Sequence, residues 1–250
     1  MVDIILSGCC GKMGRVITRS VAAAEDCRIV AGIDINKDDS LGYPVFSGFD
    51  ALDVRGDVVI DFSHPSALDG ILAYCKANGV PAVLATTGYS PEQTETIKRA
   101  AADCALFFTF NMSLGINLLI ELTKKATCIL GDAFDIEIIE AHHNQKIDAP
   151  SGTAVMIADA VKGALSEDCK YVYDRHSERK KRDKNEIGIH SIRGGTIVGE
   201  HTVMFAGHDE ILSISHSARS KEIFATGAVK AAQFMVGKPN GMYSMNDMIE

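Results

Sequence analysis

The stretch Val2 to Gly14 decides the fold, and its sequence is Val-Asp-Ile-Ile-Leu-Ser-Gly-Cys-Cys-Gly-Lys-Met-Gly. The first six residues are mostly apolar and predict a strand, and the glycines that follow predict a tight turn into a helix. This order is typical of a dinucleotide-binding fold, because amides of the turn must approach a pyrophosphate closely. The spacing is GxxGxxG rather than GxGxxG, so the glycines alone fit a simple tight connection equally well.

Residues further along strengthen the nucleotide-binding interpretation. We expect a helix over residues 15–24 and a second strand over 28–33, which ends at Asp34. An acid about twenty residues past the last glycine accepts hydrogen bonds from the adenosine ribose of a nicotinamide dinucleotide. Lys37 lies close behind and would meet a 2′-phosphate, so both NADH and NADPH stay open. The alternatives are a solvated strand end and a surface lysine.

Strands and helices continue to alternate through the first half of the chain. This order predicts a Rossmann-type, doubly wound parallel sheet, whose ligand lies beyond the carboxyl ends of the strands. Short polar segments follow three of the strands there, although each alone could be a turn or a helix cap. The expected strands are 58–62, 82–85 and 106–110, the expected helices are 66–78 and 91–104, and the polar segments are Ser63-His64, Thr86-Thr87 and Thr109 to Ser113.

The second half of the chain predicts a smaller α+β domain with a mixed or antiparallel sheet. We expect residues 1–112 to form the dinucleotide-binding domain and 113–221 to form the substrate-binding and oligomerisation domain. A C-terminal helical segment, 222–250, would pack back on the first. The charge run in 162–185 favours a solvated, mobile loop over a phosphate-binding patch. The expected helices are 114–129, 154–165 and 222–235, and the expected strands are 134–139, 187–192, 196–198, 201–206 and 210–216.

Composition limits the class of protein. A 250-residue chain that is 46% hydrophobic is typical of a globular protein of one large or two ordinary domains. A formal net charge of -8 disfavours nucleic acid or an anionic membrane as the partner, so only a local basic pocket would attract an acidic ligand. The seven cysteines lack CxxC spacing, which favours reduced thiols. With no apolar run long enough to span a bilayer, we expect a cytoplasmic protein.

A second stretch, residues 140–153, concentrates groups that can transfer a proton. His142 and Lys146 are four residues apart, which places them on one side of either a strand or a helix. Histidine titrates near neutrality and burial lowers the pKa of lysine, so we expect the pair to donate protons together. His143 lies off that line, which suits a contact with a substrate carboxylate.

The same stretch ends in a predicted helix start. Ser151 is a good N-cap, and the free amides of Gly152 and Thr153 would point at a carboxylate. Together with the bases, this predicts a site for an acidic substrate. The alternatives are a polar strand end and a simple helix cap. A histidine metal site is disfavoured because Glu140 and Asp148 do not form a recognised ligand spacing, so we expect no metal.

The run from His142 to Ala154, His-His-Asn-Gln-Lys-Ile-Asp-Ala-Pro-Ser-Gly-Thr-Ala, resembles a family signature. The family is that of the 4-hydroxy-tetrahydrodipicolinate reductases, or dihydrodipicolinate reductases, of the diaminopimelate route to lysine. Family members often have a basic residue at the position of Asn144 or Gln145, which leaves the strength of substrate attraction open. Further matching segments cover most of the chain: 8–15, 57–65, 86–88, 111–117, 193–201 and 224–232.

The resemblance implies roles for individual residues. His142 and Lys146 would be the acid/base residues, and His143, Gly152 and Thr153 would hold the carboxylates of a small dicarboxylate substrate. NADH or NADPH would transfer a hydride from C4 of the nicotinamide to the conjugated ring, with a proton from the protein. The residues that would contact this cofactor are Gly8, Cys9, Cys10, Gly11, Lys12, Met13, Asp34, Ala85, Thr86, Thr87, Thr109, Phe110, Asn111 and Met112.

Competing hypotheses belong to two classes. Another two-domain NAD(P)-dependent oxidoreductase of amino-acid metabolism would not need the cluster of His142 and Lys146. A non-catalytic NAD(P)H-binding sensor would have no reason to place proton donors beside an anion-binding helix start. In either case the small sheet leaves edges or a face to cover, so we expect a homo-oligomer, and a homotetramer as its size. The adjacent Cys9 and Cys10 suggest the hypothesis that oxidation disturbs cofactor binding.

Overall fold

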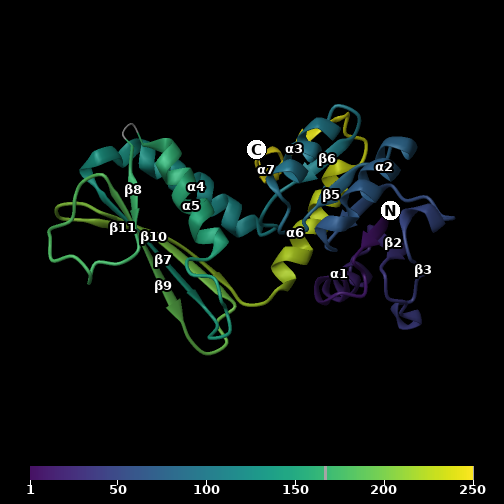
Figure 1. Cartoon of the computed structure of the whole chain (residues 1–250), viewed down its shortest axis with the longest axis horizontal. Helices are drawn as coiled ribbons and strands as arrows, with labels where there is room; N and C mark the ends of the chain where they lie inside the picture. Colours follow the sequence, from purple (N-terminus) through teal and green to yellow (C-terminus); the bar gives the residue numbers. More distant parts are fainter. Residues whose placement is uncertain (166–167, 250) are drawn as a thin grey trace. The chain divides into compact units, whose positions relative to one another are not determined.

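The computed structural model describes residues 1–165 and 168–249 of the chain (Figure 1). The chain divides into two compact units, each described by itself. The first unit contains Met1–Leu114 and Lys221–Glu250, and the second contains Gly115–Ser220.

The first unit is built on a seven-stranded sheet in which every pair of neighbours is parallel (Figure 1). The strand order is β12-β6-β5-β4-β1-β2-β3, so the direction of progression reverses between β1 and β4. The predicted doubly wound parallel sheet is therefore confirmed. The strands are β1 (Val2–Ser7), β2 (Cys27–Ile33), β3 (Val45–Phe46), β4 (Val58–Asp61), β5 (Ala82–Leu84), β6 (Ala105–Phe108) and β12 (Gly241–Tyr243).

Helices cover both faces of this sheet. The start of α3 is set by a capping box, in which the Ser90 hydroxyl accepts from the Gln93 amide and the Gln93 side chain accepts from the Ser90 amide. Gly79 ends α2 in the left-handed conformation, with φ of +63°. The α-helices are α1 (Lys12–Ala22), α2 (Leu68–Asn78), α3 (Pro91–Ala100), α6 (Glu222–Met235) and α7 (Met245–Ile249), and the 3-10 turns are Asp39–Leu41, Phe49–Ala51 and Pro65–Ala67.

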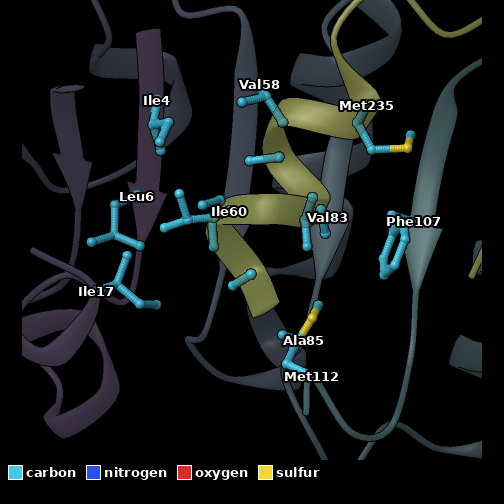
Figure 2. Packing of buried hydrophobic residues seen from close by; sticks show 14 of the residues in the cluster. Ile4, Leu6, Ile17, Val58, Ile60, Val83, Ala85, Phe107, Met112 and Met235 are labelled. Atoms are coloured by element: carbon cyan, nitrogen blue, oxygen red, sulfur yellow. The ribbon is translucent and has the colours of Figure 1, made fainter. Parts of the chain in front are cut away.

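Alternation along each parallel strand divides its side chains between two cores. Ile4 of β1 points into the core that α1 and α6 close, whereas its neighbour Ile5 points into the core beneath α2 and α3. Figure 2 shows the first of these cores, in which strand side chains and Met235 of α6 pack together. A strand buried on both faces needs apolar residues at every position, which explains the continuous apolar runs in the sequence.

The second unit is a five-stranded mixed sheet in the order β11-β10-β7-β9-β8. Strand β7 pairs parallel with β9 and antiparallel with β10. The predicted mixed sheet is therefore confirmed. Helices α4 and α5 pack on one face of it, around Ile136, Ile138 and Ile157. The strands are β7 (Asp135–His142), β8 (Lys170–Val172), β9 (Glu186–Arg193), β10 (Gly199–Ala206) and β11 (Ile211–Ala218), and the helices are α4 (Leu114–Leu130), α5 (Gly152–Ala164) and the 3-10 turn Gly131–Ala133.

Two local predictions are wrong. Residues 196–198 were expected to be a strand but form the turn and loop between β9 and β10, because Gly195, with φ of +47°, reverses the chain there. The C-terminal segment 222–250 is not one helix. Helix α6 ends at Met235, and Gly237, with φ of +76°, leads the chain into strand β12 at the sheet edge.

The loop predicted for the charge run in 162–185 is confirmed for residues 173–185, which are mostly exposed and contain neither helix nor strand, while residues 166 and 167 lie beyond the described residues. Strand β8 pairs with β9, and Arg175 contacts Glu137 at 2.7 Å and Glu186 at 2.8 Å. Arg182 contacts Glu137 at 3.0 Å. The charges are held by partners far away in sequence, which local patterns do not reveal. These ion pairs also neutralise the cations that a phosphate patch would need.

Among the described residues, no helix combines the length and the apolar character needed to cross a membrane.

Candidate functional site

Two positions of the glycine turn of the first unit, Gly8 and Gly14, have no room for a side chain. Gly8 has φ of +80°, and a Cβ there would lie 2.5 Å from the Phe62 carbonyl oxygen. A Cβ at Gly14 would overlap the carbonyl oxygens of Gly8 and Cys9, so α1 can approach the strand end only with glycine at this position. The amides at the start of α1 are thereby exposed beyond β1, where a pyrophosphate can be bound.

Asp34 follows β2 and is held in place beside this turn. Its Oδ2 accepts the Cys10 amide at 3.0 Å, and its Oδ1 accepts the Asn36 amide at 2.9 Å. The carboxylate therefore joins the end of β2 to the glycine turn and remains half-buried rather than rotating freely in solvent. This geometry suits an acceptor for ribose hydroxyl groups.

A pocket of about 670 Å³ lies against Asp34 within the first unit. It sits beyond the carboxyl ends of β1 and β4, the two strands at which the sheet order reverses, where dinucleotides bind in such folds. Its walls come from the glycine turn, from residues 33–36 and 47–50, and from residues 62–70. The volume and the glycine turn both fit the adenosine and pyrophosphate of a dinucleotide.

The other residues predicted to bind the cofactor differ in how deeply they are buried. The side chains of Cys9 and Met112 are buried in the core, so only their backbones can meet a ligand. Ala85 and Thr86 are buried at the end of β5, and Thr87 is exposed just beyond them. The remaining ones lie on the turn that begins α1 or after β6: Gly11, Lys12, Met13, Thr109, Phe110 and Asn111. Those that line the pocket are Gly8, Cys10, Gly11 and Asp34.

Cys9, Cys10 and Asp34 offer ligand atoms within 4.8 Å of one another. The two sulfur atoms are 3.9 Å apart. Burial and the neighbouring thiol raise the pKa of Cys9 to about 12, and burial also raises the pKa of Cys10. Both are therefore thiols near neutral pH, a form that reacts slowly with oxidants and binds metals weakly. This favours a packing role for Cys9.

In the second unit, the side chains on one face of β7 are apolar at the start of the strand and ionisable at its end. Ile136 and Ile138 belong to the core beneath the helices, and the same face continues with Glu140 and His142. Glu140 is fully buried and His142 is 9% exposed. The carboxyl end of β7 therefore holds an acid and a base that are both buried.

Glu140 is the centre of a buried hydrogen-bond network. Its carboxylate accepts two bonds from the Arg193 guanidinium, at 2.7 and 2.8 Å, and one from His142 Nδ1 at 2.6 Å. The Ser151 amide donates a further bond at 3.1 Å. Burial alone would raise the pKa of Glu140, but the bonds from Arg193, Ser191 and His142 outweigh it and lower the pKa to about 2. An ionised Glu140 requires a proton on His142 Nδ1, so Nε2 is the ring atom left for a substrate.

His201 of β10 lies beside this network. Its ring packs edge-on to that of His142 at 5.3 Å, and its Nε2 is 3.1 Å from Ser151 Oγ. Burial, and after it the electrostatic interaction with the neighbouring His142 side chain, lower the pKa of His201 to about 4, and Lys146 acts in the same direction. His201 is therefore neutral near pH 7, and the three basic groups share one electrostatic environment.

The segment after β7 is neither strand nor helix, so the two geometries considered for His142 and Lys146 do not apply. The chain turns after His143, whose carbonyl accepts the Lys146 amide at 3.1 Å. The Lys146 ammonium contacts Asp148 at 2.8 Å. The predicted N-cap is confirmed, because Ser151 Oγ accepts the Ala154 amide and α5 begins at Gly152, with Thr153 next. Ala149–Pro150 is a cis peptide bond.

Sequence reasoning missed three members of the network: Glu140 as a partner of His142, Arg193 and His201. A signal for Glu140 was present, since an acid two residues before a histidine shares its face of a strand. Arg193 and His201 are the two ends of a segment that resembles the family, but no spacing or periodicity links them to His142, because they reach the site through the pairing of β9 and β10 with β7.

Two family models match the chain. One is described as Dihydrodipicolinate reductase, N-terminus, and matches residues 2–112, and the other as Dihydrodipicolinate reductase, C-terminus, and matches residues 115–249. A 4-hydroxy-tetrahydrodipicolinate reductase from Clostridium novyi (strain NT) is 52% identical over 250 residues, which are 100% of this chain and 99% of the relative. A relative of the same name from Caldanaerobacter subterraneus subsp. tengcongensis is 47% identical with the same coverage.

Solved structures share the fold. A dipicolinate-bound dihydrodipicolinate reductase from Paenisporosarcina sp. TG-14 gives a TM-score of 0.82 at 24% identity, covering 98% of this chain and 99% of that chain. GenD2 from gentamicin A biosynthesis, in complex with NAD, gives a TM-score of 0.61 at 14% identity, covering 99% and 90%. The sequence relatives and the two family models, which together span both units, show that this chain belongs to the dihydrodipicolinate reductase family.

Proposed function

We propose that the chain reduces 4-hydroxy-tetrahydrodipicolinate with His142 and Lys146 as the proton-donating residues. The chain is an oxidoreductase of the diaminopimelate route to lysine, it uses NADH or NADPH, and its substrate is a small dicarboxylate. When bound, the nicotinamide supplies a hydride to the conjugated ring. The protein must then bind two carboxylates and deliver a proton to the reduced ring.

The observation that carries the assignment is the 2.6 Å contact of His142 Nδ1 with the buried Glu140 carboxylate. This contact fixes the orientation of the imidazole and leaves Nε2 to give the proton. Arg193 holds the carboxylate by both oxygens, so Glu140 cannot rotate away from the histidine. Glu140 and Arg193 are thus positioning residues that act through His142.

The substrate carboxylates would be bound by His143 and by the amides at the start of α5, Gly152 and Thr153. Gly152 is exposed at this helix start, so its amide is accessible to an anion. Lys146 would leave the exposed Asp148 carboxylate when the substrate arrives, since an ion pair with a solvated partner is easily exchanged. The dipicolinate in the Paenisporosarcina structure is a ring dicarboxylate of this kind.

The first unit would bind the cofactor. The pocket beside Asp34 would accept the adenosine, and the glycine turn would accept the pyrophosphate. The side chains or backbones assigned to it by this proposal are those of Gly8, Cys9, Cys10, Gly11, Lys12, Met13, Asp34, Ala85, Thr86, Thr87, Thr109, Phe110, Asn111 and Met112.

The test is to follow oxidation of NADH and NADPH with the product of the preceding synthase in wild type, His142→Ala and Lys146→Ala. Removal of a general acid should lower kcat by about a hundredfold or more in either variant, while dinucleotide binding, measured by calorimetry, stays unchanged. His208→Ala and Lys181→Ala remove the same residue types from exposed positions outside the site and should keep wild-type turnover. Wild-type turnover in both site variants would refute the assignment.

We further propose that the chain is a cytoplasmic homotetramer. The described cysteines are not joined by disulfide bonds, as expected in a reducing compartment. The sheet of the second unit carries apolar side chains on the face opposite α4 and α5, and Ile192 and Ile211 on that face are 51% and 65% exposed. A mixed sheet with an exposed apolar face is commonly covered by another copy of itself.

A further inference from the structure

The pocket beside Asp34 has an acidic lining. Of the described residues that form its walls, Asp34 and Asp50 carry a formal charge near neutral pH, and lysine and arginine are absent from them. His64 also lines the pocket, and its Nδ1 lies 3.2 Å from the Ser66 amide, from which it accepts a hydrogen bond.

Asp34 is fixed as an acceptor. The two amides that bind it are those of Cys10 in the glycine turn and of Asn36, two residues after Asp34, and they hold the carboxylate in place. A ribose with free hydroxyl groups offers donors to such a carboxylate. A 2′-phosphate offers acceptor oxygens and up to two negative charges, which the carboxylate repels.

The cations nearest to the pocket do not line it. Arg15 is ion-paired with Asp38 at 2.5 Å and also contacts the Cys10 carbonyl oxygen at 3.3 Å, so its guanidinium is already engaged. Lys37 is exposed on the loop that follows Asn36 and is not part of the wall. The position next to Asp34, where an arginine would serve a 2′-phosphate, is occupied by Ile35, which is 91% exposed.

We infer that this pocket selects NADH over NADPH, with Asp34, Ile35 and Asp50 as the residues that determine the preference. The inference rests on the proposed reductase function and narrows its cofactor. Asp34 accepts hydrogen bonds from the ribose diol, and Asp50 adds a second negative charge that repels a phosphate. Ile35 is apolar, so this position supplies no positive charge to offset that repulsion.

The experiment measures binding directly, by calorimetry of the full chain with ADP-ribose, 2′-phospho-ADP-ribose, NADH and NADPH. Wild type should bind each unphosphorylated ligand at least tenfold more tightly than its 2′-phosphorylated counterpart. The double variant Ile35→Arg/Asp50→Asn leaves Asp34 and its amide contacts in place, and it should reduce this ratio at least fivefold. Asp53→Asn removes an exposed aspartate of the same segment that does not line the pocket, and it should keep the wild-type ratio.

The outcomes separate this inference from the reductase function. Equal or tighter binding of the phosphorylated ligands by wild type would overturn the NADH preference alone. An unchanged ratio in the double variant would overturn the assignment of the preference to these residues. Failure of wild type to bind any of the four ligands would overturn both the preference and the proposed reductase.

Discussion

At the scale of single residues, the structure places Glu140, Arg193 and His201 around His142, one of the two proposed proton donors. Glu140 is fully buried, and its carboxylate contacts both Arg193 and His142. A buried charge is tolerated only where partners satisfy it, so the three residues form one unit. Substituting any one changes the environment of the other two.

Glu140→Gln tests this unit. The amide can still accept a bond but no longer balances the Arg193 charge, so we expect a stability loss on the order of 3 kcal/mol. We also expect kcat to fall at least tenfold with a smaller change in KM, because His142 loses its fixed orientation. The Nδ1 resonance in nitrogen-15 spectra of the His142 ring should shift, because Nδ1 loses its hydrogen bond to a carboxylate. An unaltered ring spectrum would contradict the positioning role.

His201 should make stability depend on pH. Its pKa is lowered from 6.5 to about 4 in the folded chain, so the unfolded chain binds a proton there at a higher pH than the folded chain does. Its contribution is therefore complete above about pH 6.5 and is lost as the pH falls toward 4. Between pH 7 and pH 5 this loss is about 2 kcal/mol.

Urea unfolding of wild type and His201→Asn at both pH values measures that loss. The variant should be less stable at pH 7 yet lose about 2 kcal/mol less on acidification. His208, whose side chain is 97% exposed, provides the control, and His208→Asn should follow the wild-type pH dependence. Parallel pH dependence of wild type and His201→Asn would contradict the burial argument.

At the scale of elements, helix α5 links stability to the site through its N-cap residue, Ser151. Ser151 caps the helix by accepting the Ala154 amide, and its hydroxyl also contacts His201 at 3.1 Å. Ser90 caps α3 in the same way, by accepting the Gln93 amide, but lies in the first unit. The two serines therefore share the capping role and differ in their neighbours.

Ser151→Ala and Ser90→Ala form a matched pair. Each should lower the free energy of unfolding by about 1 kcal/mol, because each leaves a helix amide without its cap. Only Ser151→Ala should also reduce kcat/KM, through the displaced His201 and the altered helix start. Thermal unfolding and steady-state kinetics of both variants check this, and an equal kinetic loss in Ser90→Ala would show that the effect is general destabilisation.

At the scale of the whole molecule, the open sheet face of the second unit predicts assembly. Sedimentation of wild type should give a mass four times the 26.9 kDa of the chain. Ile192→Lys should produce smaller species, because a lysine on a covered apolar face must be desolvated. Ile129→Lys changes a 72% exposed isoleucine of α4, on the opposite side of the sheet, and should leave the assembly intact. A monomeric wild type would contradict the proposal.

Much of the fold could be predicted because its signals are local. The apolar run of β1, the glycine turn, the cap at Ser151 and the spacing of the α6 helix each depend on neighbouring residues. The short strands β3, β8 and β12 could not be predicted, since two or three residues carry no periodicity and become strands only by pairing with an existing edge. Residues 173–185 are the exposed loop that the charge run predicted, and only the three residues of β8 were missed there.

By itself the sequence determined the parallel sheet, the mixed second sheet, the family and the basic stretch to which we assign the chemistry, because periodicity and motif spacing are encoded within short segments. Only the tertiary structure decided which groups meet. Glu140 and Arg193 are 53 residues apart and Ser151 and His201 are 50 apart, and strand register brings them together. The acidic lining of the cofactor pocket likewise arises from loops that follow different strands. Such contacts depend on the packing of the whole chain, which no local pattern specifies.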